Sequence, residues 1–134
     1  MPLPTQATRP PTTVLLVDDE PEIRELARLI LERAGLNVLD EAEDGLAALE
    51  RFKSHNPPTT PLVVLLDNRM PGLTGVQVAK EILTAYPSQI VVLFSAHLSD
   101  EIVELAEGMG VARCISKRDF TSLPEIIEGL VAAA

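Results

Sequence analysis

The sequence predicts a doubly wound α/β fold, in which helices cover both faces of a five-stranded parallel sheet. Short, continuous apolar runs rich in valine and isoleucine are typical of parallel strands that are buried on both faces. Segments with helical periodicity separate these runs, and right-handed crossovers then place the helices on the two faces of the sheet. Polar residues close four of the runs, at the edge where open α/β sheets form their binding sites.

Five segments are the predicted strands. Residues 14–17, 62–66 and 90–94 are apolar throughout, as a central strand requires. Residues 37–42 alternate between apolar and polar side chains, and residues 111–115 include Arg113. We therefore expect these two strands nearer the edges of the sheet.

Five helices are predicted between and after the strands. Apolar residues from Ile23 to Ala34 follow i, i+3, i+4, i+7 spacing, which gives a stripe that faces the sheet. Pro21 suits the first turn of this helix and Gly35 its end. The expected N-caps of the next three helices are Asp44, Thr74 and Ser99. Pro124 falls in the first turn of the fifth helix.

Length and composition indicate one domain. The chain has 134 residues, of which 46% are hydrophobic, and we assign residues 13–134 to a single domain. Residues 1–12 are rich in proline and lack an apolar stretch, so we expect a flexible tail and neither a signal peptide nor a membrane span. Cys114 is the single cysteine, which excludes an internal disulfide and fits a cytoplasmic location. The net charge of −9 disfavours direct contact with nucleic acid.

The polar residues that follow the predicted strands are expected to form one site. They are the pair Asp18 and Asp19, then Asp67, Ser95 and Lys117. Two carboxylates about 4 Å apart repel by roughly 4 kcal/mol at an effective dielectric of about 20, so the cluster requires positive charge. Lys117 supplies one charge, and a divalent ion supplies two. An oxygen-only site is what Mg²⁺ prefers.

Asp67 is the predicted phosphoryl acceptor of this site. It ends a central strand and precedes Met70-Pro71-Gly72, a turn that would hold its loop rigidly. An aspartate in such a site can form an acyl phosphate, which the metal, a lysine and backbone N–H groups would stabilise. Taken singly, the acids have simpler interpretations, such as capping the first helix. Their joint pattern favours a site.

Four motifs together resemble the signatures of bacterial response-regulator (CheY-like) receiver domains, over about residues 13 to 131. The motifs are Val17-Asp18-Asp19-Glu20, Asp67-Asn68-Arg69-Met70-Pro71-Gly72 through Gly75, Phe94-Ser95-Ala96, and Ser116-Lys117. The resemblance implies the flavodoxin-like receiver architecture. It also implies a phosphoacceptor module of a two-component or phosphorelay system, which is not an enzyme beyond its own phosphorylation and autodephosphorylation.

The resemblance assigns roles to individual residues. Asp67 would take a phosphoryl group from phosphohistidine on a sensor histidine kinase or a histidine phosphotransfer protein. Asp19, Asp67 and the backbone carbonyl of Arg69 would bind Mg²⁺, and Asp18 would act mostly through water. The remaining residues that would contact the phosphoryl group are Asn68, Ser95 as the switch hydroxyl, Ala96 and Lys117. Switching would change the face made by the fourth helix, fifth strand and fifth helix, where a protein target or a second copy would bind.

Two positions depart from the family pattern. Cys114 stands where the family usually has an aromatic residue that turns inward with the switch hydroxyl. Arg118 stands where a proline in a cis bond often follows the lysine. These departures bear on the aromatic coupling and on the shape of the loop, and we expect phosphorylation to survive both.

Two other functions compete with this interpretation. A Mg²⁺-dependent aspartate-nucleophile phosphohydrolase would need a second acid two residues after the nucleophile, where this chain has Arg69. A degenerate receiver that binds partners without phosphate would be indicated by a missing acid, and none is missing.

Overall fold

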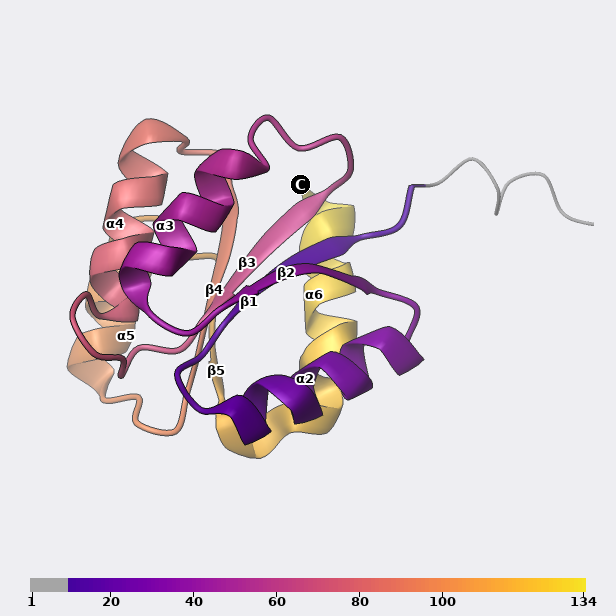
Figure 1. Cartoon of the computed structure of the whole chain (residues 1–134). Helices are drawn as coiled ribbons and strands as arrows, with labels where there is room; N and C mark the ends of the chain where they lie inside the picture. Colours follow the sequence, from indigo (N-terminus) through magenta and orange to yellow (C-terminus); the bar gives the residue numbers. More distant parts are fainter. Residues whose placement is uncertain (1–9) are drawn as a thin grey trace, which may run out of the picture.

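The computed structural model describes residues 10–134, which form one five-stranded sheet with helices on both faces (Figure 1). The strands are β1 (Thr13–Val17), β2 (Asn37–Ala42), β3 (Leu62–Leu66), β4 (Ile90–Ser95) and β5 (Arg113–Ser116). The helices are α2 (Pro21–Arg33), α3 (Gly45–Ser54), α4 (Gly75–Ala85), α5 (Asp100–Gly108) and α6 (Leu123–Ala133), and the 3-10 helix η1 (Lys117–Ser122) precedes α6. The predicted fold class is confirmed.

All the strand pairs are parallel, and the strand order is β2-β1-β3-β4-β5. The edge positions predicted for residues 37–42 and for the fifth strand are therefore confirmed. Helices α3, α4 and α5 cover one face of the sheet, and α2 and α6 cover the other (Figure 1). No helix in the described part of the chain has the length and apolar character needed to cross a membrane.

The predicted helix starts are where the sequence placed them. The side chain of Asp44 accepts a hydrogen bond from Ala47 N at 2.8 Å, and Ser99 caps α5 in the same way. Thr74 and Gln77 form a reciprocal capping box at the start of α4. These caps satisfy backbone N–H groups that have no partner inside a helix, and so they fix where each helix begins on the sheet edge.

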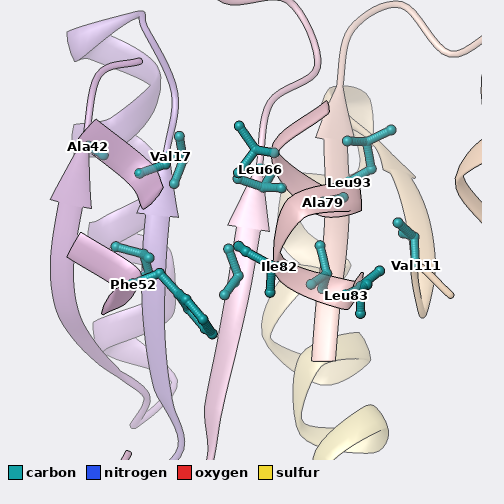
Figure 2. Packing of buried hydrophobic residues seen from close by; sticks show 14 of the residues in the cluster. Val17, Ala42, Phe52, Leu66, Ala79, Ile82, Leu83, Leu93 and Val111 are labelled. Carbon is teal, nitrogen blue, oxygen red and sulfur yellow. The ribbon is translucent and has the colours of Figure 1, made fainter. Parts of the chain in front are cut away.

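The core consists of two layers, one on each face of the sheet. On β1, Leu15 and Val17 face α3 and α4, whereas Val14 and Leu16 face α2 and α6. Figure 2 shows the first layer, where strand residues pack against helix residues. The residues labelled there are Val17, Ala42, Phe52, Leu66, Ala79, Ile82, Leu83, Leu93 and Val111. Each fully buried aliphatic side chain contributes about 1.5–3 kcal/mol, so these layers hold the strand ends in place.

The fifth strand begins two residues later than predicted. Val111 is buried, but its N–H group donates to Ala106 O at 3.0 Å and so closes the end of α5. Ala112 N then donates to Val91 O at 2.9 Å, and the strand proper starts at Arg113. An apolar residue at a helix end has the same sequence signature as one in a buried strand, which explains the difference.

The predicted tail, residues 1–12, falls mainly on residues 1–9, which lie outside the described residues. Its last residue is part of the packed structure. Thr12 Oγ1 donates to Glu128 Oε1 at 2.6 Å, and Thr12 O accepts a hydrogen bond from Asn37 N at 3.0 Å.

Candidate functional site

The sheet brings the predicted site residues to a single edge. In the parallel register, Val17 pairs with Leu66, Leu66 with Leu93, and Ser95 with Ser116. The residues at the ends of these four strands or immediately after them are Asp18, Asp67, Ser95 and Lys117. Because the carboxyl ends of parallel strands meet at the same edge, the polar residues gather there without any long-range sequence signal.

Lys117 lies among three carboxylates. Its Nζ is 2.7 Å from Asp18 Oδ2, 3.2 Å from Asp67 Oδ2 and 3.4 Å from Glu20 Oε1. Only 10% of the Lys117 side chain is exposed, and the side chains of Asp18 and Asp67 are nearly inaccessible. The ion pairs with these two aspartates are therefore poorly screened by solvent, whereas the contact with Glu20 is at the surface.

Four acids form a compact cluster in front of this lysine. One carboxylate oxygen from each of Asp18, Asp19, Glu20 and Asp67 lies within 4.8 Å of the others. Asp18 Oδ1 accepts a hydrogen bond from Glu20 N at 2.9 Å. Asp18 Oδ2 is buried and has no neutral hydrogen-bond donor among the described residues, and its charge is met by the ion pair with Lys117 Nζ. Four converging carboxylates beside one ammonium group fit a divalent cation, which prefers hard oxygen ligands.

The charge balance of the site shows in its pKa values. Burial raises the pKa of Asp67, and the Asp18 carboxylate raises it further, while Lys117 only partly offsets these effects. Burial lowers the pKa of Lys117, but its contacts with Asp18 and Asp67 more than reverse this and leave that pKa above its usual value. The site therefore carries more negative charge than one lysine can balance, and an additional cation would favour the ionised, nucleophilic form of Asp67.

The loop after Asp67 is folded tightly onto α4. A Cβ atom on Gly75 would clash with the backbone oxygen of Asp67, so only glycine allows this approach. Gly75 N donates to Asn68 O at 3.0 Å, and Val76 N donates to Asn68 Oδ1 at 3.1 Å. The side-chain oxygen of Asn68 thus holds the loop, and the contact predicted between Asn68 and a phosphoryl group stays a prediction.

Ser95 and the neighbouring predicted residues line the same edge. Ser95 is buried, and its Oγ accepts a hydrogen bond from His97 N at 3.3 Å. Ala96 is exposed. Arg69 is also exposed, and its N–H group donates to Asp67 Oδ1 at 3.4 Å. Each of these residues lies where the sequence predicted, and their roles toward a phosphoryl group or a metal remain predictions.

The structure shows the surroundings of Cys114 and Arg118, the two positions that depart from the family pattern. Cys114 is half-buried and packs against the core layer under α5, where burial raises the pKa of its thiol. Arg118 lies in the first turn of η1, where Ser116 Oγ caps the turn by accepting a hydrogen bond from Arg118 N at 3.2 Å. Phe120 in η1 packs edge-on against Phe94, with ring centroids 5.1 Å apart.

Glu20 and Arg24 contribute to the site although no role is predicted for either from the sequence pattern. Glu20 belongs to the acidic cluster, and its position directly after Asp18 and Asp19 was the available signal. Arg24, in α2, donates a hydrogen bond from Nη1 to the backbone oxygen of Asp18. Nothing in the local pattern indicates this contact, because arginine on an amphipathic helix is usually a solvated surface residue.

Fold and site together define a class: an open, parallel α/β domain with an acidic cluster and a buried lysine at the carboxyl edge of its sheet. The chain belongs to the response regulator receiver domain family, whose model matches residues 14–128. Receiver domains are phosphoacceptor signalling modules of two-component systems, and this chain is one of them. The family assignment confirms the resemblance and does not favour the phosphohydrolase alternative.

Relatives and solved structures agree with the assignment. The chain is 38% identical over 122 residues to the protein named "Probable transcriptional regulatory protein NarL" of Mycobacterium tuberculosis, a match that covers 90% of this chain and 54% of that protein. The solved receiver domain of NarL from the same species has a TM-score of 0.81 and 34% identity, with 94% and 99% of the two chains covered. A chain of the CheX-CheY-BeF3-Mg complex of Borrelia burgdorferi matches with a TM-score of 0.84 and 24% identity. The match covers 94% of this chain and 92% of the matched one. At this identity it shows the fold alone.

Proposed function

We propose that Asp67 accepts a phosphoryl group from a phosphohistidine on a sensor histidine kinase or a histidine phosphotransfer protein, in the cytoplasm. The observation that carries this proposal is the buried Asp67 carboxylate, held 3.2 Å from Lys117 Nζ within a cluster of four acids. A buried carboxylate beside an ammonium group and other carboxylates suits a nucleophile. Its negative charge would be neutralised only when Mg²⁺ and the phosphoryl donor are bound.

The transfer is a substitution at phosphorus. A carboxylate oxygen of Asp67 forms the new O–P bond as the P–N bond to the donor imidazole breaks. The bonding electron pair stays on the imidazole nitrogen, which can take up a proton. Lys117 lies close enough to Asp67 to balance the negative charge on the transferred group, and backbone N–H groups such as that of Arg69 lie beside it.

Mg²⁺ is the metal that this site would hold. Asp19, Asp67 and the backbone carbonyl of Arg69 would bind it directly, and Asp18 would act mostly through water. Carboxylate and carbonyl oxygens with open positions for water are the ligands that Mg²⁺ prefers. When bound, the ion neutralises charge on the phosphoryl oxygens and on the acidic cluster. The convergence of four carboxylates around a single lysine supports this assignment.

Phosphorylation would act as a switch through several contacts at once. Ser95, Ala96 and Asn68 would contact the phosphoryl group together with Lys117. A charge-assisted hydrogen bond from Ser95 contributes about 1.5–3 kcal/mol, whereas inverting a 1:99 population requires roughly 5.5 kcal/mol. Ser95 therefore cannot act alone. The face made by α5, β5 and α6 would change, and a protein target or a second copy would bind there.

Intact-mass measurement after incubation with acetyl phosphate and Mg²⁺ tests the proposal. The wild type should gain one labile phosphoryl group, and chelation of Mg²⁺ should abolish the gain. Asp67→Asn should gain none, whereas the control Asp44→Asn, at a helix cap, should be labelled like the wild type. Equal labelling of Asp67→Asn would exclude Asp67 as the acceptor. Multiple turnover of a phosphate ester by the wild type, lost in Asp67→Asn, would favour the phosphohydrolase instead.

A further inference from the structure

We propose that Arg24 is a positioning residue, which orients the Asp18–Asp19 segment of the acidic cluster for the divalent cation. The inference rests on the proposed function, because it concerns the metal at that site. Arg24 lies in α2, outside the four motifs that carry the resemblance. Its side chain is 17% exposed, which is unusually buried for an arginine, and it must be satisfied by partners from the protein.

Arg24 holds the peptide group that joins Asp18 to Asp19. Its Nη1 donates to the backbone oxygen of Asp18. The N–H group of Asp18 donates to Ala42 O at 3.1 Å, so the backbone of Asp18 is fixed on both sides. The peptide group is planar, and holding its oxygen therefore also holds the N–H group and Cα of Asp19. That Cα atom carries the Asp19 side chain, whose carboxylate is proposed to bind the metal directly.

Glu41 holds Arg24 in turn. Arg24 Nε lies 3.5 Å from Glu41 Oε1, and Glu41 is the neighbour of Ala42 on β2. The planar guanidinium can hold a carboxylate on one edge and a carbonyl oxygen on another. Arg24 thus connects the second strand to the loop after the first strand, across the start of α2.

A simpler interpretation is that Arg24 only ties α2 to β2 through an ion pair with Glu41. Arg28 provides the comparison, because it also pairs with Glu41 but makes no contact with the backbone of Asp18. If the ion pair were all that mattered, neutralising either arginine would have similar effects. If the contact with Asp18 matters, only the loss of Arg24 will change metal binding.

Calorimetric Mg²⁺ titration of the full chain separates the two interpretations. We expect Arg24→Gln to weaken Mg²⁺ binding by about 10- to 100-fold, as removal of an outer-shell partner of a metal ligand typically does. Arg28→Gln should bind Mg²⁺ like the wild type. Arg24→Lys keeps the charge but cannot hold the Asp18 oxygen and Glu41 together, so it should also bind more weakly. If Arg24→Gln does not fold, Arg24→Lys provides the test.

A second measurement identifies the step affected. Labelling by acetyl phosphate in Arg24→Gln should need more Mg²⁺ but should reach the wild-type rate at saturating Mg²⁺. Wild-type affinity in the Arg24 variants, an equal loss in Arg28→Gln, or full recovery in Arg24→Lys would each overturn the inference while leaving the proposed function intact. Absence of Mg²⁺ binding in the wild type would overturn both.

Discussion

Replacing Lys117 with methionine removes the ammonium group that balances two buried carboxylates. At an effective dielectric of about 20, the attraction is about 6 kcal/mol to Asp18 at 2.7 Å and about 5 kcal/mol to Asp67 at 3.2 Å. Carboxylate oxygens of the two acids lie within 4.8 Å of each other, so the repulsion that remains between them is at least about 3.5 kcal/mol at the same dielectric. Burying methionine does not require the desolvation of a charge, so part of the lost electrostatic stabilisation is recovered. Breaking a buried ion pair in this way costs about 3–5 kcal/mol net.

We therefore expect the free energy of unfolding of Lys117→Met to fall by about 3–5 kcal/mol in Mg²⁺-free buffer at neutral pH. The pKa of Lys117 is raised in the fold, so its contribution is fully present below its ordinary pKa and is lost only as the pH rises through the folded-state pKa. A neutral buffer thus measures the whole effect. Urea unfolding followed by circular dichroism gives the free energies.

The control is Lys80→Met, at an exposed position on α4, which should change stability by no more than about 0.5 kcal/mol. Mg²⁺ should stabilise both the wild type and Lys117→Met, by about 2.7 kcal/mol at a hundredfold excess over each dissociation constant. Lys117→Met should respond at least as strongly as the wild type at equal Mg²⁺, because the ion supplies the missing charge. If Lys117→Met were as stable as the wild type without Mg²⁺, the electrostatic account of the site would be refuted.

Two further predictions concern the loop after Asp67 and the helix cap that follows it, and a third concerns an ion pair between β2 and the end of α3. Gly75→Ala should lower the free energy of unfolding by about 1–3 kcal/mol and slow labelling by acetyl phosphate, because its Cβ would meet the Asp67 backbone oxygen; unchanged labelling would show that the loop can move. Thr74→Ala should cost about 1 kcal/mol in urea unfolding through loss of the capping box, and a neutral result would count against the cap. Burial raises the pKa of Asp40, but the hydrogen bond with His55 and other contacts outweigh burial and lower this pKa overall. Asp40→Asn should therefore lower the free energy of unfolding by about 0.2–1 kcal/mol at neutral pH. That cost is present above the ordinary aspartate pKa and should vanish as the pH falls through the folded-state pKa; unfolding free energies that stay apart in acid would contradict the assignment.

The sequence alone determined the layered fold and the place of the site. Wholly apolar runs at 14–17, 62–66 and 90–94 favour strands buried on both faces, because each run is short and helical segments separate them. Parallel strands share one carboxyl edge, which places Asp18, Asp67 and Lys117 at that edge, and the strand order then decides how close they come. The N-caps at Asp44, Thr74 and Ser99 could likewise be predicted from the sequence, because capping depends on a few adjacent residues.

Which atoms pair within the site depends on how the elements pack against one another. Lys117 lies nearer to Asp18 than to Asp67, and Glu20 completes the acidic cluster. The contact of Arg24 with the Asp18 backbone depends on how α2 docks against β1 and β2. The start of β5 depends on a hydrogen bond that Val111 makes to the end of α5. Local periodicity records which face of an element is buried, whereas these contacts depend on the relative placement of elements, which the packing of the whole core sets.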